Sequence, residues 1–415
     1  MNGVPEAAWA YALREVPQTS QLMVTATPEQ ARRLAAELSC WRPQTTICTF
    51  LSSGETPYTR LSAEPRALQS RMGLLTQLAL GTQPSVIVTD AQAIGRRLPA
   101  PEHIECQCRL LAPGDHVERS QFLKLLQSAG YYAAPRTEEP GTFSARGSVI
   151  DLWPPNDPKP SRLDFFGDEL ESIREIDPGL QRSGAKKDLF ALGPARLIEP
   201  GPDLAQSSRS KLLELGEQQK LPSESVRQTL DRLSAGIQDP LLQALEPVLL
   251  PLRGPLLDWL SKETKVVLCD PEGIDRELDG IDQRFFSGYE KLIDEALASP
   301  PESHRVERAK LWRRLKSSNP LLITPRSPGE TQNINGLDDM VARLRLTPES
   351  DEDRLLPLAK QIQRWRREGF LPIMLSPPGR QERLRQRLNG LGLGLRNLAT
   401  QTVVDWSGCQ PQDTS

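Results

Sequence analysis

The chain has 415 residues, more than one ordinary hydrophobic core accommodates, which predicts about two to four domains. Hydrophobic residues make up 38% and charged residues 25%, with a net charge of −3 and a sequence pI near 5.9. This balance argues against a strong basic field for sequence-independent DNA binding, and no apolar run is long enough to span a bilayer. Because the N-terminal residues also lack the layout of a signal peptide, we expect a cytoplasmic protein with weak or no direct DNA binding.

The first 110 residues alternate between helical patterns and short apolar runs. Strands are predicted at residues 21–25 (QLMVT), 46–50 and 85–89 (SVIVT). Helices are predicted at residues 5–14, 28–38 and 63–80. Thr27 is the expected cap of the second helix. Such alternation is typical of a parallel sheet covered by helices, as in nucleotide-binding domains.

A nucleoside triphosphatase of this architecture needs a glycine-rich loop after its first strand, with a lysine followed by serine or threonine. Neither Gly-Lys-Ser nor Gly-Lys-Thr occurs in the sequence, and the first predicted strand is followed by Ala26-Thr27-Pro28-Glu29. The string Leu292-Ile293-Asp294-Glu295 resembles the acidic box of such motors, but without the loop we expect only an acidic pair on a helix surface. We therefore predict no nucleotide cofactor and no catalytic residues.

The cysteines and histidines do not form the paired spacing of a zinc site. Cys106-x-Cys108 lacks a second pair, although His103 and His116 flank it. We expect reduced, structural thiols and no bound metal, with a metal site at this pair as the minor alternative.

Residues 111–196 predict a small sheet with one helix. The helix is expected at residues 120–128, ending at Ala129-Gly130, where a glycine commonly follows a helix. One strand is predicted at 143–153, and after a proline-rich loop two extended runs follow at 162–166 and 169–176. Only Gly167-Asp168 separates these two runs, which predicts a two-residue β-hairpin.

The register of this hairpin sorts its side chains onto two faces. The expected pairs are Phe166 with Glu169, Phe165 with Leu170, Asp164 with Glu171 and Leu163 with Ser172. The apolar face then carries Leu163, Phe165 and Leu170, and the other face carries Arg162, Asp164, Phe166, Glu169 and Glu171. An aromatic ring among charges indicates a docking surface, because interface hot spots favour aromatic and arginine side chains rimmed by polar groups. The alternative is that Phe166 is tucked under a neighbouring loop.

The same stretch resembles a known family. The strings R-G-x-x-I-D-L-x-P from Arg146 and R-L-D-F-F-G-D-E-L-E-S-I-R from Arg162, followed by Q-R-S, are similar to the second domain shared by the excision-nuclease subunit UvrB and the bacterial transcription-repair coupling factor. Gly130-Tyr131 and residues 140–143 (PGTF) fit the same pattern. Glu55-Thr56-Pro57-Tyr58 with Arg71 fits more loosely. UvrB carries an intact phosphate loop, whereas the coupling factor keeps the fold without it, so the missing loop favours the coupling factor.

The resemblance implies a UvrB-like α/β organisation. Residues 1–110 are expected to form a degenerate RecA-like, P-loop-type domain (1a), residues 111–196 an inserted UvrA-interaction domain (2), residues 197–334 a segment (1b) that completes the first domain and leads into a linker, and residues 335–415 a small α/β domain (3). It also implies contacts with UvrA, the damage-recognition ATPase, through Arg146, Arg162 and Phe166 with Asp164 and Glu169 beside them. A surface arginine paired with Asp164 or Glu171 is the alternative for either arginine alone.

The second half of the chain carries weaker signals. Leucine-rich helices broken by prolines precede a predicted strand at 265–270 (KVVLCD), and Pro300-Pro301, Pro325 and residues 327–335 predict an exposed linker. Later, helices at 354–368 and 381–389 alternate with strands at 371–376 and 400–405. These helices carry a basic cluster, Arg364, Arg366, Arg367, Arg380, Arg383, Arg385 and Arg387. We interpret it as a solvated face, with weak nucleic-acid contact as the alternative.

The expected function is non-catalytic recruitment of UvrA in nucleotide-excision repair. Coupling factors continue with a polymerase-binding barrel and a DNA translocase, and no helicase motif occurs in these 415 residues. We therefore expect a fragment or a naturally short protein whose UvrA-binding face is uncovered, and which reaches RNA polymerase and other coupling-factor domains only indirectly. The alternatives are an ATP-dependent repair helicase or translocase subunit with a diverged nucleotide site, and a scaffold that holds other domains apart.

Overall fold

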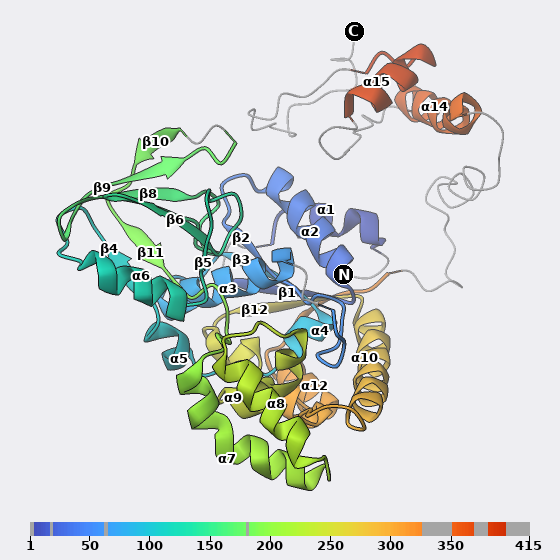
Figure 1. Ribbon diagram of the computed structural model, residues 1–415. Coiled ribbons are helices and arrows are strands. Elements are labelled where there is room, and N and C mark those ends of the chain that lie inside the picture. The colour runs from blue at the N-terminus through green and yellow to red at the C-terminus, as the bar shows by residue number, and fades with distance from the viewer. Residues whose placement is uncertain are drawn as a thin grey trace. The chain divides into compact units, whose positions relative to one another are not determined.

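A computed structural model describes residues 4–16, 20–61, 65–179, 182–325, 351–368 and 381–395 (Figure 1). The chain divides into two units, Met1–Arg326 and Ser327–Ser415. The strands expected at 371–376 and 400–405, and the linker expected at 327–335, lie outside the described residues.

A five-stranded parallel sheet forms the centre of the larger unit. In the order β13-β12-β1-β3-β2, its strands are β13 (Leu321–Ile323), β12 (Lys265–Cys269), β1 (Gln21–Thr25), β3 (Val86–Asp90) and β2 (Ile47–Phe50). Met23 of β1 pairs with Val88 of β3 and with Val267 of β12. The predicted parallel α/β sheet and its strands at 21–25, 46–50, 85–89 and 265–270 are confirmed.

Helices cover both faces of this sheet because successive side chains of a buried parallel strand point in opposite directions. Met23 points to a core that it shares with α1 (Trp9–Leu13), preceded by η1 (Glu6–Ala8), and α2 (Pro28–Trp41). Leu22 points to the opposite core, formed with α3 (Pro65–Ala79), α4 (Ala91–Ile94), α10 (Pro271–Leu292) and α12 (Arg308–Ser317). Figure 1 shows α1 and α2 on one side of the sheet and α4, α10 and α12 on the other.

The turn from β1 into α2 ends in the predicted cap. The Thr27 side chain accepts a hydrogen bond from the Gln30 backbone N–H, and the Gln30 side chain accepts one from the Thr27 N–H. This reciprocal capping box satisfies two N–H groups of the helix start within the chain itself. A capping box therefore occupies the position at which a phosphate loop would follow the first strand.

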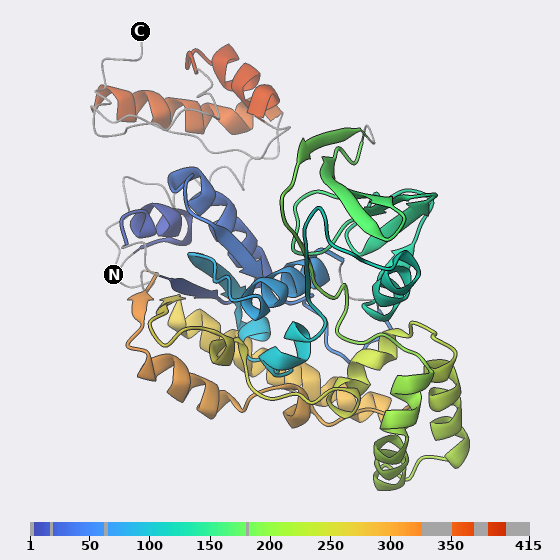
Figure 2. The same cartoon turned by 90° about the vertical axis from the view of Figure 1, so that its left-hand side faces the viewer.

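The chain leaves the parallel sheet after β3 and returns to it with β12. Between them lies a six-stranded sheet, whose order is β10 (Ser183–Lys186), β9 (Glu169–Ile176), β8 (Ser161–Phe166), β7 (Val149–Leu152), β6 (Thr142–Arg146) and β5 (Tyr132–Ala133). The strand before this sheet in the chain, β4 (Arg109–Leu111), and the strand after it, β11 (Phe190–Leu192), form a separate antiparallel pair. Helix α6 (Arg119–Ser128) packs on one face, seen in teal below the green strands in Figure 2.

The single strand predicted at 143–153 is wrong, because the chain reverses within it. β6 and β7 pair antiparallel around Gly147-Ser148, and Gly147 has a φ of +56°, which glycine adopts without steric cost. The expected loop at 154–160, the helix at 120–128 and both strands of the Gly167-Asp168 hairpin are found as predicted.

Helices follow the six-stranded sheet before the chain re-enters the parallel one. They are α7 (Pro202–Gln218), α8 (Ser223–Ser234), η2 (Pro240–Leu245), α9 (Glu246–Leu249) and η3 (Leu256–Trp259), and α5 (Pro101–Glu105) lies earlier in the chain. The first four share a core that includes Leu212, Leu230 and Leu245. Among the described helices, none combines the length and apolar character needed to cross a membrane.

Two expectations for the end of this unit are wrong. Pro300-Pro301 is not an exposed linker, because Pro301 starts helix α11 (Pro301–His304) and residues 304–306 at its end are buried. Asp294 and Glu295 do not lie on a helix, because α10 ends at Leu292 and both acids occupy the turn after it. Glu295 there forms an ion pair with Arg60, at 3.0 Å between Oε2 and Nη2.

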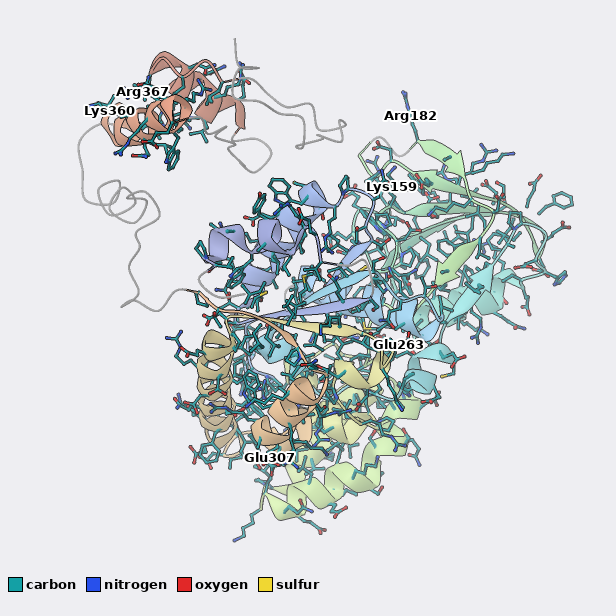
Figure 3. The ribbon with its side chains drawn as sticks, turned by 180° about the vertical axis from the view of Figure 1, so that it is seen from behind. Lys159, Arg182, Glu263, Glu307, Lys360 and Arg367 are labelled. Atoms are coloured by element: carbon teal, nitrogen blue, oxygen red, sulfur yellow. The ribbon has the colours of Figure 1, made fainter. Side chains whose placement is uncertain are left out.

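The smaller unit contains α14 (Asp351–Arg367) and α15 (Gln381–Gly390), whose bounds agree closely with the helices predicted at 354–368 and 381–389. They pack through Ala359, Ile362 and Leu388. Arg364 pairs with Glu368, and Arg385 with Glu382, on exposed surface. Figure 3 labels Lys360 and Arg367 on α14. Such intrahelical pairs are typical of a solvated charged face.

Buried charge gathers where α9 and α11 lie beside the chain that follows α4. Arg96 and Glu246 form an ion pair in which the Glu246 side chain is only 4% exposed. Burial opposes ionisation of Glu246, but the charge and hydrogen bond of Arg96 hold its pKa below the ordinary value. His304 lies beside this pair and is 4% exposed, and its Nε2 has no hydrogen-bond partner among the described residues. Burial lowers the pKa of His304 to about 4.

We predict that His304 makes the fold sensitive to mild acid. The unfolded chain takes up this proton near pH 6.5, whereas the folded chain does so only near pH 4. The contribution of His304 to stability is therefore complete above pH 6.5 and falls by about 3 kcal/mol as the pH drops towards 4. Denaturant unfolding of wild type and His304→Gln at pH 7.5 and 4.5 measures it, and the wild type should lose more stability than the variant. Equal losses would contradict the prediction.

Candidate protein-binding surface

The β8–β9 hairpin is organised by its turn. Gly167 has a φ of +64°, and the pairs that flank the turn, Phe166 with Glu169 and Phe165 with Leu170, are those predicted. The segment before α6 also holds the turn from outside. The Val117 N–H donates to the Asp168 carbonyl at 2.6 Å, and the Arg119 N–H donates to the Asp168 carboxylate at 3.3 Å. These long-range hydrogen bonds have no signal in the sequence.

Further from the turn the predicted register is wrong. Asp164 pairs with Ser172 rather than Glu171, and Leu163 pairs with Ile173 rather than Ser172, because a β-bulge shifts the register between Asp164 and Phe165. Leu170 and Ile173 are both buried although an odd separation places them on opposite faces of a regular strand. One extra residue in β9 returns both to the core.

The two adjacent phenylalanines of β8 point in opposite directions, as predicted. Phe165 is 4% exposed and its ring lies 6.2 Å from that of Phe122 on α6, whereas Phe166 is 79% exposed. No other large hydrophobic side chain in the described part of the chain is as exposed. The alternative in which Phe166 is tucked under a loop is therefore wrong.

We call the sheet face opposite α6 the outer face. The register aligns Arg146 of β6, Val149 of β7, Asp164 of β8 and Ser172 of β9 in one row across it. Phe166 lies two residues beyond Asp164 towards the turn. The fold therefore brings predicted residues from separate strands, Arg146 and Asp164, onto the same end of the outer face as Phe166.

Glu169 and Asp164 are the acidic neighbours of Phe166 in the hairpin. Glu169 is exposed and pairs directly with Phe166 across the hairpin. Asp164 is half-buried, and its carboxylate accepts a hydrogen bond from the Ser172 hydroxyl at 2.7 Å. Two acidic groups thus rim the exposed ring.

Arg162 occupies the next row and is held by an ion pair. Its Nε and Nη2 donate to the two carboxylate oxygens of Asp151 at 2.7 and 2.9 Å, and Nη1 lies 3.3 Å from the Ser183 hydroxyl. The hydrogen bond that Arg162 donates to Asp151 is the main reason that the pKa of Arg162 is raised. The expected alternative of pairing with Asp164 or Glu171 is corrected, because Asp151 is the direct cross-strand neighbour.

The guanidinium group of Arg146 is more available to bind a partner than that of Arg162. Its side chain is exposed and donates to the Pro135 carbonyl, without a carboxylate partner among the described residues. At the other end of the hairpin, Lys159 and Arg182 border the sheet (Figure 3), and Lys159 is paired with Glu175. Of the two predicted arginines, Arg146 is thus the one without a carboxylate partner in the described chain, whereas Arg162 is paired with Asp151.

Within the described ranges, no three His, Cys, Asp or Glu side chains cluster as metal ligands would. Cys106 is exposed and Cys108 is buried, and burial raises the pKa of the Cys108 thiol to about 11.

Comparison with known proteins identifies the segment that carries this surface. Residues 110–197 match the model of the UvrB interaction domain family, and they include the whole six-stranded sheet and α6. A transcription-repair-coupling factor of Myxococcus xanthus is 28% identical over 322 residues, which cover 75% of this chain and 27% of that protein. A coupling factor of Haemophilus influenzae is 27% identical over 328 residues, which cover 76% of this chain and 28% of that protein.

The chain is a relative of the transcription-repair-coupling factors. The resemblance to the UvrB-like region of coupling factors is thereby confirmed, and this chain spans just over a quarter of the length of those two coupling factors. The UvrABC system protein B of Chlorobium limicola is 31% identical over 131 residues, which cover only 32% of this chain. Similarity to the coupling factors therefore extends well beyond the domain that they share with UvrB.

We predict opposite effects of truncating the two phenylalanines. Phe165→Ala should lower the free energy of unfolding by about 3–5 kcal/mol, because it removes a buried ring from the core under α6. Phe166→Ala should change it by less than about 0.5 kcal/mol, because the ring is mostly in solvent. Denaturant unfolding followed by circular dichroism makes the comparison. If Phe166→Ala proved the less stable variant, the assignment of the two faces would be wrong.

Proposed function

We propose that this chain is a non-catalytic module that recruits UvrA in nucleotide-excision repair, and that it binds UvrA through the outer face. One observation carries the proposal: the 79% exposed ring of Phe166 lies, rimmed by charges, in the segment that matches the UvrB interaction domain. A monomer gains nothing from displaying such a ring to water, whereas a partner that covers it gains a hot spot. RNA polymerase and other coupling-factor domains are then indirect partners.

Each of the five predicted site residues has its own role in this proposal. Phe166 supplies the apolar anchor, and Glu169 and Asp164 form its polar rim. Arg146 supplies a guanidinium that is free to bind a carboxylate of the partner bidentately. Arg162 is committed to Asp151, so it positions the strands of the outer face and offers the partner only its exposed edge.

We also infer that the parallel sheet is a degenerate RecA-like domain into which the UvrA-binding domain is inserted. The support is topological, because the chain departs after β3 and returns with β12, and chemical, because a capping box occupies the β1–α2 turn. The proposed boundaries are 1–110, 111–196, 197–334 and 335–415, for domains 1a, 2, 1b with its linker, and 3.

UvrA affinity of surface variants tests the proposal. Phe166→Ala should weaken binding of the full chain by about 2 kcal/mol or more, roughly thirtyfold. Phe286→Ala is the matched control, since Phe286 is 58% exposed but lies on α10. Calorimetry or surface plasmon resonance with purified UvrA measures both. Equal affinity of the two variants would remove the outer face from the site, and no affinity in the wild type would favour the scaffold alternative.

Arg146→Ala should weaken UvrA binding without loss of stability, because its only partner in the described chain is a carbonyl on the surface. Arg209→Ala, an exposed arginine of α7, controls for the lost charge. Arg162→Ala is a poorer test, since it leaves the Asp151 carboxylate, 9% exposed, without its arginine and costs stability as well. Full UvrA affinity in Arg146→Ala would exclude this residue.

The rival function, an ATP-dependent helicase or translocase subunit, makes a different prediction. It requires saturable, magnesium-dependent binding of ATP at micromolar concentration. We expect none, because the β1–α2 turn has neither the glycines nor the lysine that hold the phosphates. Equilibrium binding of labelled ATP with and without magnesium decides between the two functions.

A further inference from the structure

A second polar site lies in the parallel-sheet part of the larger unit. A cavity opens beyond the carboxyl ends of β2 and β3, and the side chains that matter for its chemistry are Ser52, Arg71, Gln92, Arg96, His304 and Arg305. Its free space of about 20 Å³ has room for one or two water-sized atoms. Ligands of open parallel sheets commonly bind in this position.

Two of the three arginines in this cavity are buried without a full set of partners. Arg71 is 8% exposed and forms no hydrogen bond or ion pair with the described residues, although the charges of Glu246 and Asp90 act on it. Arg305 is 6% exposed, and its Nε and Nη1 have no hydrogen-bond partner in the part of the chain that the structure describes. The Arg305 Nε forms an ion pair with the half-exposed Asp282 carboxylate, at 3.4 Å from Oδ1 but without hydrogen-bond geometry, and its Cζ lies 5.1 Å from the centre of the Phe285 ring.

The nearby buried carboxylates are already occupied. Asp90 accepts three backbone N–H groups, from Ser52 at 2.7 Å, Gln92 at 3.0 Å and Ala93 at 3.1 Å. Glu246 is bound by Arg96, and the Arg96 Nε has no hydrogen-bond partner within the described ranges. The cavity thus holds more guanidinium groups than free carboxylates, and an unpaired buried charge is costly.

Neutral hydrogen-bonding groups complete the lining. The Ser52 hydroxyl and the His304 Nε2 are buried and have no partner in the described chain. Burial and the neighbouring Arg96 lower the pKa of Arg71 to about 9, so its guanidinium still carries a proton at neutral pH. The site therefore offers positive charge and N–H and O–H donors around one small space.

We propose that this cavity binds one phosphate-sized oxyanion, supplied either as inorganic phosphate or as the terminal phosphoryl group of a larger molecule. Arg71 and Arg305 bind its oxygens in the planar, charge-assisted geometry that guanidinium groups favour, and the Ser52 hydroxyl donates to a third. One or two oxygens fill the cavity and the others remain at its mouth. The site lies beside β2 and β3, separate from the β1–α2 turn, and is independent of UvrA binding.

Thermal unfolding in phosphate tests the site. At pH 7 and constant ionic strength set with sodium chloride, the midpoint of wild type should rise with 0–20 mM phosphate, since a ligand that binds only the folded state stabilises it. Arg71→Gln should lose most of that rise, while remaining at least as stable as wild type without phosphate, because it removes an unpaired buried charge. Arg209→Gln, on exposed α7, should respond like wild type.

Two results would overturn the proposal: no rise in wild type, or an equal rise in Arg71→Gln. Ser52→Ala provides a milder variant should Arg71→Gln fail to fold, and it should weaken phosphate binding at least threefold by calorimetry. An unchanged affinity there would also count against the site. Both variants should keep wild-type UvrA affinity, so failure here and failure of the proposed function are distinguishable.

The source of the oxyanion is decided by comparing inorganic phosphate with glycerol 3-phosphate in calorimetry. A dissociation constant at least tenfold lower for the ester assigns the site to a phosphoryl group at the mouth of the cavity. Equal or weaker binding of the ester assigns it to free phosphate. Loss of both signals in Arg71→Gln is required in either case.

Discussion

The outer face depends on one constraint, the alternation of side chains along β8 anchored at the Gly167-Asp168 turn. Adjacent residues of a strand point to opposite faces, so a fixed register buries Phe165 under α6 and places Phe166 in solvent. A shift of the strand register by one residue would bury Phe166 and expose Phe165, so the outer face would carry a different set of side chains. The turn is also held from outside the hairpin, because the backbone N–H groups of Val117 and Arg119 donate hydrogen bonds to Asp168.

The bulge in β9 reconciles this register with a continuous core. Without an extra residue, a strand that buries Leu170 exposes Ile173, and the sheet under α6 is left incomplete. The same register makes Asp151 and Arg162 direct neighbours, which converts an arginine expected to face a partner into half of a structural ion pair. The surface that we propose for recognition is therefore narrower than the charge pattern indicates, and it centres on Phe166 and Arg146.

A different constraint shapes the parallel sheet. The chain leaves the parallel sheet after β3 and returns to it much later, so residues more than 200 positions apart in the sequence meet. Arg305 forms a β-bridge with Arg96, and its side chain lies against Gly95. Positive groups from α3 (Arg71), from the chain after α4 (Arg96) and from the end of α11 (Arg305) are thus concentrated, and among the described residues only Arg96 has a buried carboxylate partner, Glu246. Neither the outer face nor this cavity uses the β1–α2 turn, which the capping box of Thr27 and Gln30 closes.

The sequence by itself determined the local features: the strands at 21–25, 85–89 and 265–270, the cap at Thr27, the Gly167-Asp168 hairpin and the burial of Phe165 against the exposure of Phe166. Each depends on residues that are close together in the sequence, where hydrophobic periodicity and the position of glycine directly predict the local structure. Tertiary structure alone decided the bulge in β9, the Arg162–Asp151 pair, the short strands β4, β5, β10 and β11, and the meeting of Arg71 with Arg305. These depend on which distant segments pack together, and so on core filling and cross-strand register, which local patterns do not encode.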